Sequence, residues 1–166
     1  LEAQNLDMAR HMFLNCTSLK TITIDRLNAP LLRDISKFVM GCTSLTAANL
    51  TNWEVPKLLY TSMFFNACTN LERVNMSNFR AATIDNMSNM FAGLTSLKEV
   101  DLTDCELPAV TNMRRIFANC SNLTTIKGEL NLPSVTNLSQ MFNGCTALTN
   151  INLNNLNCPQ LATSGI

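Results

Sequence analysis

The sequence predicts a right-handed α/β solenoid of about six strand–helix repeats, each 26 residues long. Apolar residues and prolines return at this interval along almost the whole chain. The clearest column is one of cysteines, with Leu94 in its fourth place: Cys16, Cys42, Cys68, Cys120 and Cys145. Phenylalanines keep the same interval: Phe13, Phe65, Phe91, Phe117 and Phe142. A repeat of this length marks stacked units that share one core, so we interpret residues 1–166 as a single solenoid domain.

The strand of each repeat is predicted by a period of two. In the clearest unit, an apolar series follows the leucine-rich-repeat pattern L-x-x-L-x-L-x-x-N/C-x-L: Leu97, Val100, Leu102, Cys105 and Leu107. The alternation at Val100 and Leu102 indicates a short strand with one buried side. A proline then separates this strand from the next element, at a corner where no ladder N–H is needed.

A short helix is predicted after each proline, because the apolar spacing changes to three and four residues. Such a stripe is formed by Val110, Met113, Ile116 and Phe117. Residues with side-chain oxygens stand before these stretches as expected N-caps: Asp7, Asp85, Thr111 and Thr136. Gly or Asn before most members of the cysteine column is expected to end each helix in the left-handed conformation.

Two stretches carry a family resemblance. Residues 90–102 and 135–146 are similar to the pattern M-F-x-G-C-T-x-L-x-x-I-x-L of the BspA-like leucine-rich-repeat family of bacterial surface proteins. The resemblance implies a secreted, extracellular or cell-surface location and adhesion to a host or microbial surface protein. The chain opens Leu1-Glu2-Ala3 without a Met, an export signal or an anchor, so we expect it to be a segment of a longer surface protein.

Composition excludes several partners. The formal net charge is zero and only 14% of residues are charged, which does not favour nucleic acid or anionic membranes. No apolar run reaches the roughly 20 residues needed to cross a bilayer, so no membrane insertion is expected in this segment.

Chemistry at a catalytic or metal site is not predicted. His11 is the single histidine, no nucleophile or phosphate-loop motif is present, and no C-x-x-C pair offers metal ligands. We therefore expect no enzyme activity, no cofactor and no metal. Because the cysteines share columns with Leu, Trp and Phe, we interpret them as free thiols buried in the core.

The exposed strand residues are the candidate site. With Val100 and Leu102 buried, their neighbours point outward onto what we expect to be a concave face. The predicted partner-binding residues are Thr23, Asn49, Arg73, Asn75, Glu99, Asp101, Lys127, Asn150 and Asn152. The leading hypothesis is adhesion or protein–protein interaction through this face. The alternatives are a structural spacer that presents another domain, and a solvated face with no ligand. End-to-end self-association is a further expectation.

Overall fold

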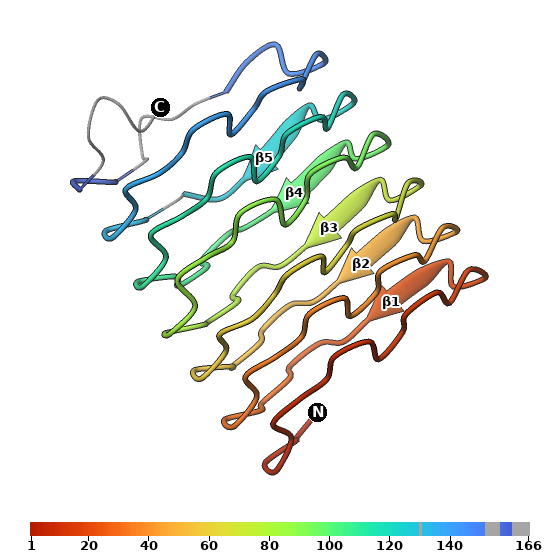
Figure 1. The fold of residues 1–166 in the computed structure, drawn as a ribbon, viewed down its shortest axis with the longest axis vertical. Helices are drawn as coiled ribbons and strands as arrows, with labels where there is room; N and C mark the ends of the chain where they lie inside the picture. The colour runs from red at the N-terminus through yellow and green to blue at the C-terminus, as the bar shows by residue number, and fades with distance from the viewer. Residues whose placement is uncertain (130, 152–156, 161–166) are drawn as a thin grey trace.

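The structure, a computed structural model, describes residues 1–129, 131–151 and 157–160. It is a parallel β-solenoid in which the chain winds through successive coils (Figure 1). Each coil contributes one short strand to a single five-stranded sheet of order β1-β2-β3-β4-β5. The strands are β1 Thr21–Thr23, β2 Ala47–Asn49, β3 Arg73–Asn75, β4 Glu99–Asp101 and β5 Thr125–Lys127.

The predicted strands and their register are confirmed. Each residue pairs with the residue one repeat further along, as Val74 does with Val100. The middle residue of the first four strands is buried and its two neighbours are half-buried or exposed, as the period of two predicts. The repeat length therefore sets the register of the sheet directly.

The predicted helices are wrong: the described residues contain no helix. Their place is taken by six turn segments, at residues 7–15, 33–41, 59–67, 85–93, 111–119 and 136–144. Most N–H groups of these segments that donate to a carbonyl do so either to the residue three positions earlier or to the adjacent coil. Met90 donates to Met87, for example, and Phe91 donates to Ile116. Successive turns closed at three residues give the same apolar spacing as one face of a helix.

Each turn segment also holds two left-handed residues, four positions apart. The first column is His11, Lys37, Met63, Asn89, Arg115 and Gln140, and the second is Asn15, Gly41, Ala67, Gly93, Asn119 and Gly144. The left-handed conformation predicted for the second column is confirmed, but the first column interrupts any helix that could precede it. The predicted N-caps are likewise replaced. In four turn segments the side chain of the residue after the cap position, such as Asn86 or Asn112, accepts a hydrogen bond from the backbone N–H two residues further on.

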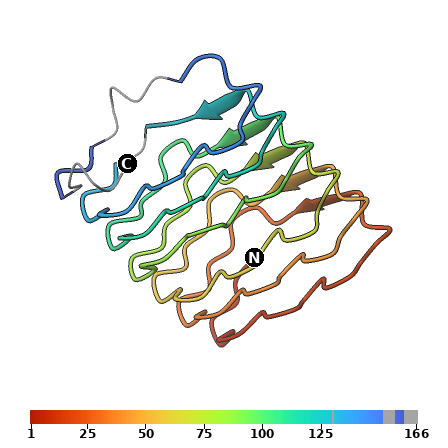
Figure 2. The same ribbon diagram turned by 45° about the horizontal axis from the view of Figure 1, so that its top comes forward.

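Coil spacing explains why turns replace helices. Hydrogen-bonded coils lie about 4.8 Å apart, whereas a helix with its side chains is about 10 Å wide. Stacked helices would therefore have to fan the repeats into a horseshoe. Here parallel bridges also join the coils away from the sheet, as between Asp34 and Tyr60. The coils consequently stack in a straight array, and the expected concave face is not formed (Figures 1 and 2).

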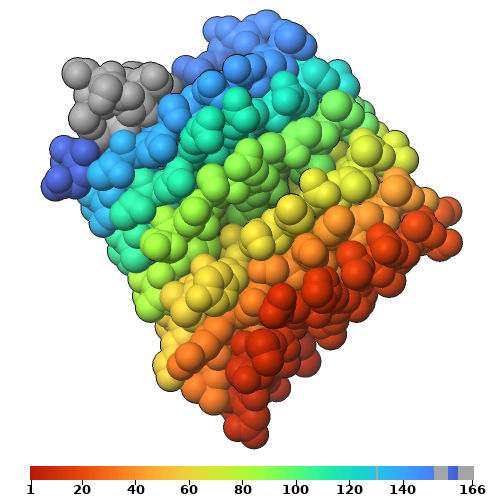
Figure 3. Space-filling view, in the orientation of Figure 1, coloured from red at the N-terminus to blue at the C-terminus, as the bar shows by residue number. Residues whose placement is uncertain are grey.

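Aromatic columns fill the interior of the array. Phe65, Phe91, Phe117 and Phe142 stack in sequence, with ring centroids 5.5, 5.3 and 5.7 Å apart. Phe38, Phe64 and Trp53 form a neighbouring cluster, in which the Trp53 indole N–H donates to the Ile24 carbonyl at 2.7 Å. Close-packed coils with few gaps form the exterior (Figure 3).

The wall of turn segments is interrupted once, by a seam between segments 59–67 and 85–93. At each of the other junctions between turn segments, four N–H groups donate to carbonyls of the next coil. Between segments 33–41 and 59–67 the donors are Ile35, Lys37, Val39 and Gly41. The equivalent N–H groups of Thr61, Met63, Phe65 and Ala67 form no such bonds. A Cβ added to Gly93 would meet nothing within 4 Å, whereas one added to Gly144 would lie 2.6 Å from Asn119 Oδ1. The coils are thus less tightly joined at the seam, while β3 and β4 remain paired.

Hydrogen exchange is expected to be fastest along the seam. The amides of Met63 and Ala67 should exchange at least about tenfold faster than those of Lys37 and Gly41, because they lack the bond to the next coil. Residue-resolved exchange measured by NMR checks this, with Asn89 as a further bonded control. Equal protection of the two segments would show that the seam is closed in solution.

Candidate functional site

The outward strand residues line a shallow groove that crosses all five strands. Its walls come from Thr21, Ile22, Thr23, Ala47, Ala48, Asn49, Arg73, Val74, Asn75, Glu99, Asp101 and Lys127. The parallel register places equivalent residues of neighbouring coils side by side, so the groove runs along the stack. The sequence thus brings polar side chains from distant positions onto one surface.

Seven of the nine predicted partner-binding residues line this groove: Thr23, Asn49, Arg73, Asn75, Glu99, Asp101 and Lys127. Asn150 is exposed but is not among the lining residues. Asn152 lies outside the described residues. That these residues bind a partner stays a prediction.

Four of the polar groups in the groove serve the fold itself. The Asp101 carboxylate accepts a bond from the Thr103 N–H at 3.0 Å, and Asn75 Oδ1 accepts one from Ser77 at 2.9 Å. Lys127 Nζ contacts Glu99 Oε1 at 2.6 Å, and this hydrogen bond raises the pKa of the lysine. The pair is exposed to solvent, which screens its charges, so it contributes little to the stability of the fold.

Two other polar groups in the groove are unengaged. Arg73 forms no ion pair or side-chain hydrogen bond with any residue that the structure describes. Asn49 Oδ1 is buried and likewise has no hydrogen-bond partner there. Ala47 is the partner of Arg73 across β2 and β3. The Asn49 oxygen is closed to a ligand, so the group that this part of the groove offers is the guanidinium of Arg73, which favours an anion.

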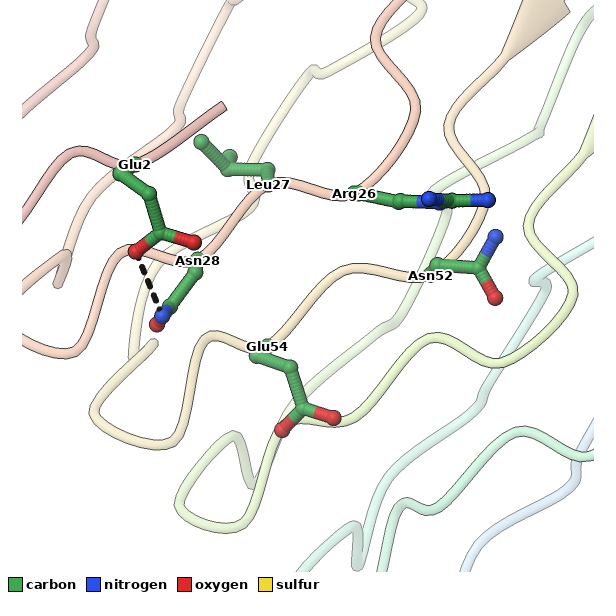
Figure 4. Close-up of a pocket in the computed structure, with 6 residues that line it drawn as sticks. All are labelled: Glu2, Arg26, Leu27, Asn28, Asn52 and Glu54. Atoms are coloured by element: carbon green, nitrogen blue, oxygen red, sulfur yellow. Dashed lines mark hydrogen bonds between the residues drawn. The ribbon is translucent and has the colours of Figure 1, made fainter.

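A second depression lies at the corner after the strands and was not predicted. It is lined by Glu2, Arg26, Leu27, Asn28, Asn52 and Glu54 (Figure 4). Asn28 Nδ2 donates to Glu2 Oε2 at 2.8 Å, and the dashed line in Figure 4 marks this bond. One repeat further on, Arg80 lies 3.5 Å from Glu54 and 2.9 Å from Glu106. The sequence carried a signal for this charged corner, because charge alternates along the column of Glu54, Arg80 and Glu106. Their ion pairs tie adjacent coils together at the surface.

Five of the cysteines, with Leu94, form a second column: Cys16, Cys42, Cys68, Cys120 and Cys145. None of the seven cysteines forms a disulfide, and four are buried: Cys42, Cys68, Cys120 and Cys145. Each of these donates its S–H to a carbonyl of the preceding coil at 3.0–3.1 Å. Burial raises the pKa of Cys68 and of Cys120 to about 12. The prediction of buried thiols is confirmed for these four and wrong for Cys16, which is exposed; Cys105 and Cys158 are half-buried.

Leu94 takes the cysteine position at the seam. It cannot donate to the preceding coil as Cys68 and Cys120 do, and it is fully buried. The thiol column and the backbone ladder therefore break at the same junction. A larger side chain without a donor is a physical reason for the looser contact there.

Within the described part of the chain, no three His, Cys, Asp or Glu side chains lie close enough together to hold a metal ion. A search of the same residues for a helix long and apolar enough to cross a membrane finds none. The described surface therefore offers grooves and charged columns.

Fold and repeat together define the chain as a repeat-built parallel β-solenoid. The family described as "Mycoplasma protein of unknown function, DUF285" matches residues 6–123 and 95–163, and the chain belongs to this family. Two overlapping matches agree with a sequence that repeats internally. Comparison with curated proteins and with solved structures found no match.

Proposed function

We propose that this chain is a non-catalytic interaction module that binds a protein partner through the groove on its strand face. The carrying observation is the Arg73 guanidinium, which lines the groove and has no ion-pair partner among the described residues. Solenoids commonly use extended surfaces of this kind for binding. An acidic segment of a partner protein fits this arginine, since its carboxylate can meet the guanidinium.

A surface location and an adhesive role are parts of the same proposal. They are supported by the resemblance of residues 90–102 and 135–146 to BspA-like repeats of bacterial surface proteins. Straight stacking of coils without helices departs from the concave face that the sequence predicted. The adhesive role therefore depends on the groove more than on shared curvature.

Charge reversal at Arg73 tests the groove. Random peptides displayed on phage are selected on the immobilised chain, and the enriched peptides are measured for affinity. We expect acidic peptides whose affinity falls at least tenfold for Arg73→Glu, because a charged hydrogen bond to carboxylate is replaced by repulsion. Arg114→Glu is the matched control, since that arginine is exposed on a turn segment away from the groove.

Asp101 is a poor site for this test, because its carboxylate holds the turn at Thr103 and its reversal would disturb folding. Equal affinity of enriched peptides for the wild type and Arg73→Glu would remove the groove from consideration. Failure to enrich any peptide would favour the second function below.

The second candidate is a structural spacer, favoured by the straight stack. Every coil adds the same rise of about 4.8 Å, and backbone bonds join the coils on more than one side. Such an array is stiff and its length follows the number of repeats. A spacer would tolerate exchange of the groove residues that do not hold the fold, such as Arg73, while keeping its reach.

A further inference from the structure

The third turn segment, 59–67, carries an apolar cluster between two segments whose equivalent residues are polar. Leu59, Tyr60 and Met63 are 36%, 58% and 53% exposed. The equivalent residues of the preceding segment are Arg33, Asp34 and Lys37, and those of the following segment are Asp85, Asn86 and Asn89. Among the turn segments, large exposed apolar side chains otherwise occur only in the first described segment, at Met8, Met12 and Leu14, so within the stack the cluster does not follow from the demands of the repeat. Exposed apolar groups gathered at one place mark an interaction surface.

Opposite charges flank the cluster on its two sides. The Arg33 carbonyl accepts bonds from the N–H groups of Leu59 and Tyr60 at 2.9 and 3.0 Å, which places Arg33 beside Leu59 in the preceding coil. Asp85 occupies the same column in the following coil, where Phe91 stacks on Phe65 at 5.5 Å. Neither Arg33 nor Asp85 has an ion-pair partner among the described residues. The order across the seam is thus cation, apolar cluster, anion.

We propose that this surface binds a second copy of the same chain across a two-fold axis. An axis that lies in the interface and runs along the third turn segment keeps each column in place and reverses the order of the coils. Leu59, Tyr60 and Met63 of the two copies then face one another. Arg33 of each copy faces Asp85 of the other, so two charge pairs form around the apolar centre.

Self-complementarity identifies the occupant. An unrelated partner would need no relation between the two charges, whereas a two-fold contact requires opposite charges at equal distances on either side of the axis. In the column of Leu59, Arg33 and Asp85 supply opposite charges one coil to either side of segment 59–67, and an axis midway between them makes the two distances equal. The contact also covers the seam, where the wall of turn segments is least joined. It is separate from the groove on the strand face and from end-to-end association.

Restoring the repeat consensus tests the apolar centre. Leu59→Thr with Tyr60→Asn places there the residues found at Thr111 and Asn112, so folding is expected to be kept. Sedimentation equilibrium of the wild type should show a dimer that dissociates on dilution, since a small interface binds weakly. The double variant should dissociate at least tenfold more readily, with an unchanged midpoint of urea unfolding.

A charge exchange tests the symmetry itself. Arg33→Asp alone should weaken the dimer at least tenfold, because two pairs become repulsive at once. Adding Asp85→Arg restores opposite charges at both places and should return the dissociation constant to near that of the wild type. Arg114→Glu serves as the control and should have no effect. A wild type that stays monomeric at millimolar concentration, or a double exchange that does not recover association, would overturn the proposal.

Discussion

Replacing Phe117 with alanine is expected to lower the free energy of unfolding by about 3–5 kcal/mol. Its side chain is fully buried and lies between Phe91 and Phe142, with ring centroids 5.3 and 5.7 Å away. Truncation removes both contacts and leaves a cavity that the regular spacing of the coils cannot close. Urea unfolding followed by far-ultraviolet circular dichroism measures the change.

Phe142→Ala is the matched control for this variant. Phe142 is half-buried at the end of the same stack and contacts one ring in place of two. A clearly smaller loss is expected, because part of its surface already meets water and fewer contacts are removed. If the two variants lost equal stability, the stack would not be the continuous core that we describe.

The strands could be predicted because their signal is local. Alternation at Val100 and Leu102 and the constant repeat length fix which side chains are buried and which coil neighbours which. The same alternation of buried and exposed positions predicted seven of the residues that line the groove. These inferences needed only the period of the pattern and the pairing of equal positions.

The helices could not be decided from apolar spacing, because Met87, Met90 and Leu94 recur at intervals that turns and helices share. The distinguishing feature is the spacing between coils, which is a property of the stack and not of one repeat. Asn89, four residues before Gly93, was a usable signal. Two left-handed residues so close together do not fit within one helix.

The state of each groove residue also lay beyond the sequence. Asp101 and Asn75 hold turns, while Asn49, in the same column, leaves its oxygen unpaired. Such differences depend on small shifts between coils that column identity does not record. Leu94 carried more information than its interchange with cysteine indicated, since it marks the seam.

Thiol reactivity is expected to divide the cysteines sharply in the native protein. At pH 8, a thiol with a pKa of about 12 is about a thousandfold less ionised than one at the ordinary value of 9.0, and the thiolate is the reactive form. Cys68 and Cys120 are in addition closed to reagent by complete burial. We therefore expect Cys16 to react with a maleimide or with Ellman's reagent at once. Cys68 and Cys120 should react at least a thousandfold more slowly, as fast as the array opens.

Mass mapping of the labelled peptides at successive times identifies each site, and the same protein in urea, where all seven thiols react, is the control. Opening at the seam separates Cys68 from Leu94 and leaves both neighbours of Cys120 in place, so it should release Cys68 before Cys120. Rapid native labelling of Cys120 would mean that the coils of Leu94 and Cys120 separate, and it would contradict the S–H bond to the Phe91 carbonyl. Labelling of Cys68 ahead of Cys120, with fast amide exchange at Met63, would place the weakest junction of the solenoid at Leu94.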